Sequence, residues 1–216
     1  QYLDEATRTP CLNTQAAYDA AEFYTRILRD TAPEGVVNYG WSECIAEMQA
    51  GTVAMICDSS GFMGQVVDPE LSTVADKIGF AAIPQVGGIT GGTHVNHWML
   101  GLSAMSPNPD AGWLFIQWAT SPEMTKKTGL VTGNSARESM WADEEFRAAF
   151  AYEGYIDAAL QSSTISIPEI NPQIPESQEL SVIVENALHE IYGGADVKAT
   201  MDNAQQLAVE LMERGL

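Results

Sequence analysis

The sequence has few basic side chains and no long apolar segment. Lys and Arg account for 10 of the 216 residues and Asp and Glu for 29, so the formal net charge is −19. A surface of that sign repels nucleic acid and anionic lipid. The longest apolar stretches fall far short of the roughly 18 residues that a membrane helix needs. These absences argue against a nucleic-acid-binding protein and against a membrane-spanning one.

Cysteine is also scarce, with Cys11, Cys44 and Cys57 as the three examples. They form no CxxC pair and lack the spacing of metal ligands, and their odd number leaves at least one thiol unpaired. Cys44 and Cys57 lie among apolar neighbours, so we expect both to be small core residues. A disulfide between those two is the less favoured alternative.

The remaining composition predicts a folded chain that alternates strands and helices. Hydrophobic residues make up 45% of the sequence and charged residues 18%, which supports a sizeable core. Alternating elements indicate an α/β fold. Strands are expected at 52–57, 78–84 and 98–104. Helices are expected at 14–30, 42–50, 177–192 and about 196–214. Shorter helices are expected after Asn108-Pro109, after Ser121-Pro122 and on both sides of Gly154 within 143–161. The predicted N-caps are Thr14, Ser42, Asn108, Ser121 and Ser177.

Apolar periodicity predicts which helix faces are buried. In the helix at 177–192 we expect Leu180, Ile183, Val184, Ala187, Leu188 and Ile191 to point inward. In the last helix the inward set is Val197, Met201, Ala204, Leu207, Ala208 and Leu211. The helix after Pro109 is apolar on most sides, so it is predicted to be mostly buried, with Trp113 and Trp118 in the core.

Recognisable catalytic and cofactor motifs are absent. GGITGG at 87–92 has no Lys after it, and His189 lacks the second His of a zinc-protease helix. His94 and His97 would need further ligands to hold a metal ion. No Ser lies in a GxSxG turn. We therefore predict no metal, no cofactor and no catalytic residue, although a carboxylate pair for glycoside hydrolysis stays open as an alternative.

Predicted loops instead combine aromatic and polar side chains. Aromatic faces cover the C–H faces of sugars, while carboxylate, amide, imidazole and guanidinium groups hydrogen-bond to hydroxyls. This mixture is typical of a carbohydrate site. The alternatives for two members are a packing role for Trp41 and pairing with a surface acid for Arg137. The set comprises Tyr39, Trp41, Asp58, Ser59, Phe62, His94, Asn96, His97, Trp98 and Arg137.

The order of these segments resembles the family 1 extracellular solute-binding proteins, the sugar- and polyol-binding branch that includes maltose-binding protein. The resemblance rests on AAYDAAEFYTRILRDTAPEGVVNYGWSECIAEMQAGTVAMICD, IGFAAIP, HWMLGLSAMSPNPDAGWLFIQWATSPE, SARESMW and ALHEIYGGADVKATMDNAQQLAVELMERG. It spans nearly the whole chain. One departure is Gly112, where the family usually has Ala.

The resemblance implies the type II periplasmic-binding fold, in which two α/β lobes enclose the ligand. It begins in mid-family, so we expect a C-terminal fragment. Residues 1–83 would be the first part of the C-terminal lobe, 84–130 an excursion belonging to the N-terminal lobe, and 131–216 the closing helices of the C-terminal lobe. The excursion would lack its sheet partners, which predicts rearrangement, a domain swap or a dimer.

The resemblance also implies a function without a covalent step. Such a protein binds a sugar or sugar alcohol in the interlobe cleft and delivers it to the membrane subunits of an ABC permease. It would be periplasmic, or extracellular and membrane-associated, and not an enzyme. The alternatives are a glycoside-acting enzyme and an interaction module without a ligand. The predicted ligand-binding residues are Trp98, Asp58, Phe62, Trp41, His97, Asn96 and Arg137.

Overall fold

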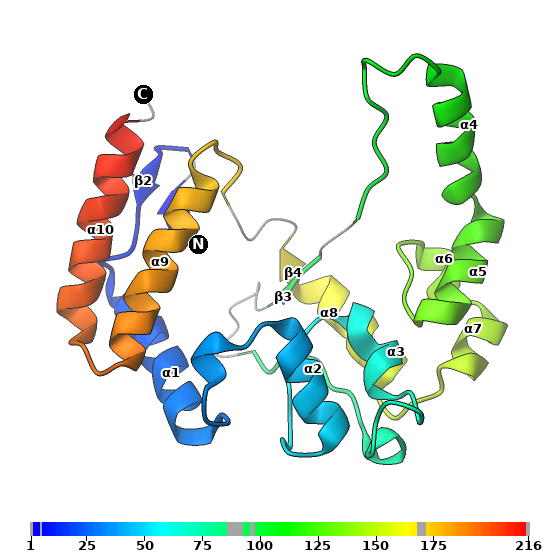
Figure 1. Ribbon diagram of the computed structural model, residues 1–216, viewed down its shortest axis with the longest axis horizontal. Helices are drawn as coiled ribbons and strands as arrows, with labels where there is room; N and C mark the ends of the chain where they lie inside the picture. Colours follow the sequence, from blue (N-terminus) through cyan, green and yellow to red (C-terminus); the bar gives the residue numbers. More distant parts are fainter. Residues whose placement is uncertain (1, 5, 86–92, 96–97, 168–171, 215–216) are drawn as a thin grey trace. The chain divides into compact units, whose positions relative to one another are not determined.

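The structure, a computed structural model, describes residues 2–4, 6–85, 93–95, 98–167 and 172–214. The chain divides into two compact units (Figure 1). Unit 1 comprises Gln1–Tyr39 and Glu169–Leu216, and unit 2 comprises Gly40–Pro168. This division follows contacts within the chain. It does not test the assignment of segments to two lobes, which stays a prediction. Among the described residues, no helix is both long and apolar enough to cross a bilayer.

Unit 1 is a small helical bundle with one β-hairpin. Figure 1 shows α1, α9 and α10 side by side, with the short hairpin against α10. The two strands pair antiparallel, with Leu3 opposite Pro10. The elements are β1 (Leu3–Asp4), β2 (Thr9–Pro10), α1 (Gln15–Thr31), the 3-10 turn η1 (Val36–Asn38), α9 (Ser177–Tyr192) and α10 (Val197–Arg214).

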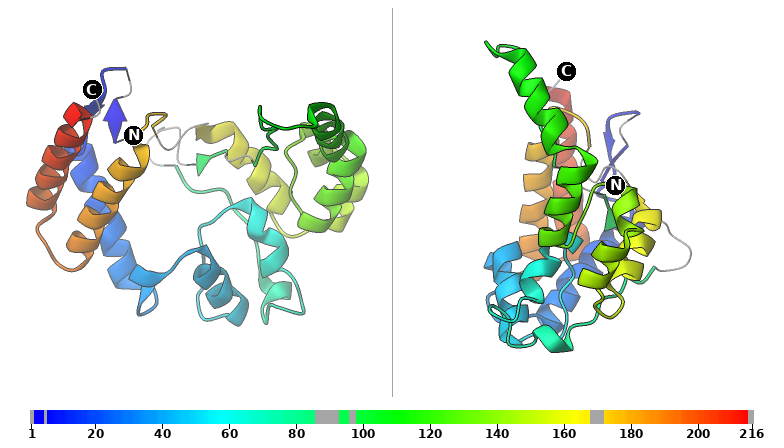
Figure 2. Two further views of the ribbon diagram at one scale, coloured as in Figure 1. Left: turned by 45° about the horizontal axis from the view of Figure 1, so that its top comes forward. Right: turned by 90° about the vertical axis from the view of Figure 1, so that its right-hand side faces the viewer.

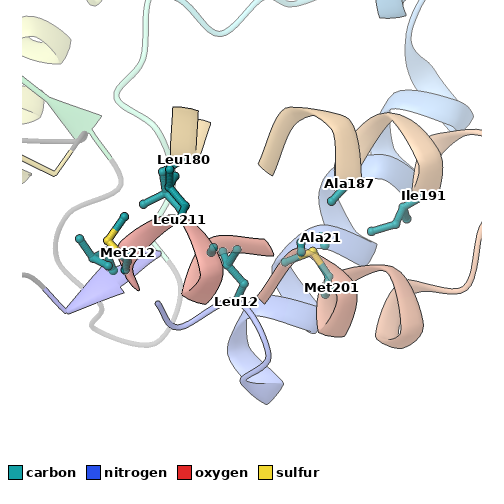
Figure 3. Packing of buried hydrophobic residues seen from close by; sticks show 11 residues of the cluster. Leu12, Ala21, Leu180, Ala187, Ile191, Met201, Leu211 and Met212 are labelled. Atoms are coloured by element: carbon teal, nitrogen blue, oxygen red, sulfur yellow. The ribbon is translucent and has the colours of Figure 1, made fainter. Parts of the chain in front are cut away.

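The core of unit 1 lies between the three helices and the hairpin, as Figure 3 shows from close by. Most of the inward residues predicted for α9 and α10 are buried or half-buried here, so the periodicity is confirmed. Leu207 is the exception, because it is 43% exposed. The buried members are Leu3, Leu12, Ala21, Leu180, Ala187, Ile191, Met201, Ala204, Ala208, Leu211 and Met212.

One side chain ties the hairpin to the last helix. The Gln205 amide donates to the Pro10 carbonyl at 2.9 Å and accepts from the Leu12 amide at 2.7 Å. Both bonds satisfy backbone groups that the short strands leave unpaired. The first residues of unit 1 are thereby fixed to its last helix.

Unit 2 consists of short helices joined by long extended segments. Its only β-pairing in the described residues is parallel, with Thr93 opposite Ser166 and His94 opposite Ile167. Figure 2 shows α4 and α5 following one another at the break before Pro122. The elements are α2 (Trp41–Ala50), η2 (Ser60–Phe62), α3 (Met63–Val66), η3 (Ala75–Lys77), β3 (Thr93–His94), α4 (Pro109–Ala119), α5 (Pro122–Thr132), α6 (Glu138–Trp141), α7 (Glu144–Ala149), α8 (Tyr155–Ile165) and β4 (Ser166–Ile167).

The predicted helices are confirmed, with three corrections to their caps. Asn108 stands at the N-cap position of α4, but its side chain accepts no capping hydrogen bond. Thr14 and Ser121 accept hydrogen bonds from the amides of Ala17 and Met124, as expected of N-caps. Ser42 is not a cap, because α2 begins one residue earlier and the Gly40 amide donates to the Glu43 carboxylate at 2.8 Å. Likewise Ser177 is the first residue of α9 rather than its cap.

The three predicted strands at 52–57, 78–84 and 98–104 are wrong, because the structure has extended or bent chain there instead. A strand requires a neighbour with which to exchange backbone hydrogen bonds. Within the described part of the chain no strand pairs with these segments. Apolar composition alone therefore predicted an extended backbone but not a sheet.

The predicted burial of α4 is also wrong. None of its residues is buried, and Trp113 and Trp118 are 55% and 56% exposed. Within the described residues α4 packs chiefly on α5 and on Leu102, so most of its circumference has no cover. Cys57 is exposed rather than in the core, and Cys44 is half-buried.

Candidate functional site

The candidate site is built around two stacked aromatic rings in unit 2. Trp41 is the first residue of α2 and Phe62 the last residue of η2. Their ring centroids lie 4.8 Å apart with an interplanar angle of 1°. Trp41 remains 55% exposed, so the pair offers an open aromatic surface. Such a surface suits the apolar face of a sugar or the carbon chain of a polyol.

Polar groups of the neighbouring turn lie beside this aromatic pair. The Asp58 carboxylate accepts from the Ser59 amide at 2.6 Å, and the Ser59 hydroxyl accepts from the Gly61 amide at 3.1 Å. These local bonds fix the turn that carries Phe62. The Asn134 amide group donates to the Ser60 hydroxyl at 3.4 Å. Exposed oxygen and amide groups thus lie in the turn that leads to Phe62, as recognition of hydroxyl groups requires.

A buried cluster beneath the turn holds it in place. Met63 directly follows η2 and packs with Phe146, Phe150 and Tyr155. The Tyr155 hydroxyl donates to the Gly133 carbonyl at 2.5 Å, and burial raises the pKa of this tyrosine, so it stays protonated. This bond anchors the end of α5 beside the residue that reaches Ser60. The platform therefore rests on packed side chains rather than on a loose loop.

The surroundings of the Cys44 thiol on α2 disfavour its ionised, reactive form. Burial raises the pKa of Cys44, and the negative charges of Asp58 and Glu43 raise it further. The three cysteines are free, so the structure contains no disulfide between Cys44 and Cys57. Among the described residues no group of His, Cys, Asp and Glu could hold a metal ion.

The other predicted site residues are not gathered around the platform. The Arg137 guanidinium donates to the Thr120 carbonyl at 2.6 Å and to the Thr125 hydroxyl at 3.4 Å, so it binds the end of α4 rather than a surface acid. Trp98 is 99% exposed and contacts neither ring of the aromatic pair. Asn96 and His97 lie outside the described residues. The ligand-binding roles of all these residues remain predictions.

Sequence reasoning missed the polar groups that only the fold brings to the platform. Asn134 lies 74 positions after Ser60, so only the fold brings the two side chains together. The signal that could have found it is Gly133. This residue ends α5 with a φ of +75°, and such a turn places the next side chain away from the helix axis.

A charged cap above the buried cluster gives a pH-dependent prediction. Asp143 caps α7, accepting from Lys126 at 2.8 Å and from the Phe146 amide at 3.0 Å. These bonds, that from Lys126 foremost, hold the pKa of the carboxyl below its usual range. The ionised carboxylate therefore stabilises the fold at pH values above its unfolded-state pKa of about 3.9. This stabilisation is lost as the pH falls through the lower pKa that the group has in the folded state.

We therefore expect Asp143→Asn, which keeps a capping oxygen, to be less stable than the wild type at pH 7. The difference should shrink as pH falls below about 3.9 and vanish once the pH lies below the lowered folded-state pKa, where both side chains are neutral. Urea unfolding followed by tryptophan fluorescence across this pH range measures it. A difference that is the same at every pH would contradict the assigned role of the carboxylate.

Comparison with known proteins extends these observations. The family model of the bacterial extracellular solute-binding proteins matches residues 2–126, which is more than half of the chain. A probable amino-acid ABC transporter periplasmic-binding protein of Sinorhizobium fredii is 26% identical over 184 residues, covering 85% of this chain and 40% of that protein. The mannitol-binding protein of Pseudomonas aeruginosa is 34% identical over 102 residues, covering 47% of this chain and 23% of that protein.

A solved structure agrees. The solute-binding protein of an ABC transporter from Agrobacterium radiobacter, in complex with ribitol, superimposes with a TM-score of 0.85 at 26% identity. The match covers 98% of this chain and 53% of that one, so the chain spans about half the length of this neighbour. The predicted fold class, part of a two-lobe periplasmic-binding fold, is thereby confirmed. The chain belongs to the family of bacterial extracellular solute-binding proteins.

Proposed function

We propose that this chain forms part of the solute-binding component of an ABC importer and that its ligand is a sugar or sugar alcohol. The observation that carries the proposal is the exposed Trp41–Phe62 platform with polar groups at its edge. The platform supplies the apolar contact, and the polar edge supplies directional hydrogen bonds. No step of covalent chemistry is needed.

The ligand class follows from this geometry and from the relatives. Two of them bind mannitol and ribitol, and both ligands combine an apolar carbon chain with many hydroxyl groups. Another relative is described as a probable amino-acid-binding protein. An α-amino acid carries two opposite charges, and Arg137, the arginine among the predicted ligand-binding residues, is held by the Thr120 carbonyl. A neutral polyhydroxylated ligand fits the platform better.

We further infer that the ligand is delivered to the membrane subunits of an ABC permease outside the cytoplasm. In a full-length binding protein, ligand would shift an equilibrium between open and closed lobes toward the closed form. Asp58 and Phe62 would act from one lobe, and Trp98 with Asn96 and His97 from the other. Association of two copies of this chain belongs to the same proposal.

The proposal is tested by calorimetric titration of the chain with ribitol, mannitol, maltose and a set of amino acids. We expect at least one sugar or sugar alcohol to bind, and Trp41→Ala to weaken that binding about tenfold or more, which corresponds to roughly 1.4 kcal/mol. A ligand that binds the native form should also raise the melting temperature.

Trp118→Ala is the matched control, because this indole is equally exposed, lies in the same unit and belongs to α4. It should leave the affinity unchanged. Equal losses of ligand affinity in the two variants would show that the platform is not part of the binding site. If only amino acids bind, the proposed ligand class is wrong. If the chain binds none of the solutes tested, the proposed function fails for this chain.

A further inference from the structure

The turn that ends α5 is fixed by hydrogen bonds within unit 2. The Gly133 amide donates to the Gly129 carbonyl at 2.8 Å, and the Gly133 carbonyl accepts from the Tyr155 hydroxyl at 2.5 Å. The Asn134 amide donates to the Thr132 hydroxyl at 3.4 Å. A turn whose backbone groups are satisfied in this way holds its side chains in one arrangement. The half-buried side chain of Asn134 is therefore presented in a defined position.

The residue after Asn134 sets the orientation of its side-chain amide. The Asn134 Oδ1 atom accepts from the Ser135 amide at 2.9 Å, and the Ser135 carbonyl in turn accepts from the Trp141 indole N–H at 3.1 Å. A backbone amide only donates, so the oxygen of Asn134 must face Ser135 and the NH2 group must face away from it. That NH2 group donates to the Ser60 hydroxyl at 3.4 Å.

Asn134 and Ser60, called the donor pair below, retain two hydrogens for another acceptor. The Asn134 NH2 group has two hydrogens, and the Ser60 oxygen accepts one of them. Because that oxygen accepts, the hydrogen of the Ser60 hydroxyl is directed elsewhere. None of the residues that the structure describes accepts this hydrogen or the second hydrogen of Asn134. Their acceptor is therefore water or a bound ligand.

The donor pair lies at the turn that carries Phe62 of the platform. Ser60 and Phe62 are the first and last residues of η2, and a rise of about 2 Å per residue separates them by about 4 Å along its axis. Gly61 stands between them, and the Asn134 Nδ2 atom lies 3.7 Å from the position that a Cβ of Gly61 would take. An extended sugar alcohol is longer than this separation. One molecule can therefore cover the ring and reach the donor pair.

The polarity of the donor pair determines the group that it recognises. Two donors bind the lone pairs of an oxygen atom, which a hydroxyl group supplies and a CH2 group does not. A ligand without that hydroxyl would leave both donors unpaired in the complex. We propose that Asn134 is a specificity-determining residue, which together with Ser60 binds the oxygen of one hydroxyl group of the ligand. This inference rests on the proposed function and names the group that sets specificity at the same site.

The test is calorimetric titration of the chain with ribitol, mannitol and maltose, each beside its monodeoxy analogues. For the wild type, we expect the loss of one particular hydroxyl group to weaken binding at least tenfold, because the donor pair is then unsatisfied. Asn134→Asp keeps an oxygen for the Ser135 amide, but its second oxygen accepts the Ser60 hydrogen, so both donors are lost. This variant should bind the parent ligand at least tenfold more weakly and no longer distinguish it from the deoxy analogue.

Two further variants separate this role from a general effect on the fold or the charge. Ser60→Ala deletes an exposed hydroxyl and should lose the same discrimination. Asn108→Asp is the matched control, because it adds the same charge to unit 2 at an exposed asparagine whose side chain makes no capping bond. It should keep the affinity and the discrimination of the wild type.

The inference is overturned if Asn134→Asp still distinguishes the parent ligand from its deoxy analogues as the wild type does, even if its affinity falls. It is also overturned if Asn108→Asp loses the discrimination, since the added charge would then be the cause. In both cases the proposed function stands, provided that a ligand binds and Trp41→Ala weakens its binding. If none of the three ligands binds, the proposed function and this inference fail together.

Discussion

Gly154→Ala should destabilise unit 2 by about 3 kcal/mol or more, since strained backbone and steric overlap add. Gly154 precedes α8 with a φ of +75°, a conformation that costs an L-residue about 1–2 kcal/mol. An added Cβ would also lie 2.1 Å from the Phe80 carbonyl oxygen. The Phe80 backbone cannot shift freely away from the added Cβ. Its amide donates to the Glu153 carbonyl at 2.8 Å, and the Phe80 ring packs on Tyr155.

Gly35→Ala, in unit 1, is the comparison for the conformational part of this loss. Gly35 has a φ of +87°, but no atom lies within 4 Å of the place that an added Cβ would take there. It should therefore lose only the conformational part, about 1–2 kcal/mol. Urea unfolding followed by far-ultraviolet circular dichroism measures both variants. Equal losses of stability in Gly154→Ala and Gly35→Ala would show that the overlap with the Phe80 carbonyl adds no cost.

Phe146→Ala should remove about 3–5 kcal/mol from the stability of unit 2. Phe146 is 0% exposed and contacts the rings of Trp141 and Phe150 at centroid distances of 5.4 and 5.0 Å. The five tryptophans all lie in unit 2, so tryptophan fluorescence reports on this unit during urea unfolding. Because the same cluster supports η2, ligand affinity should fall along with stability.

Phe115→Ala provides the comparison, as it deletes the same phenyl group from α4, where it is 55% exposed. At a concentration where the chain is monomeric, its effect should stay within about 0.5 kcal/mol of zero. A loss as large as that of Phe146→Ala would mean that α4 is covered after all.

The chemistry of the site was predictable from residue types, but its assembly was not. Trp41, Asp58 and Phe62 stand out because aromatic and acidic side chains occur together in predicted loops. Trp98 and Arg137 share that character, yet one is left fully exposed and the other is bonded to the end of α4. Residue type indicates what a side chain can bind, whereas only folding decides which side chains it meets.

The sequence by itself determined the helices and the core of unit 1. Their 3.6-residue periodicity and capping residues are local features, and the partners they need lie within the same chain. Only the tertiary structure decided the strands and the burial of α4, because both depend on neighbours that sequence periodicity cannot supply. An apolar segment such as 98–104 becomes a strand only beside another strand. No such strand lies beside it among the described residues, so the segment that best marks the family is left exposed.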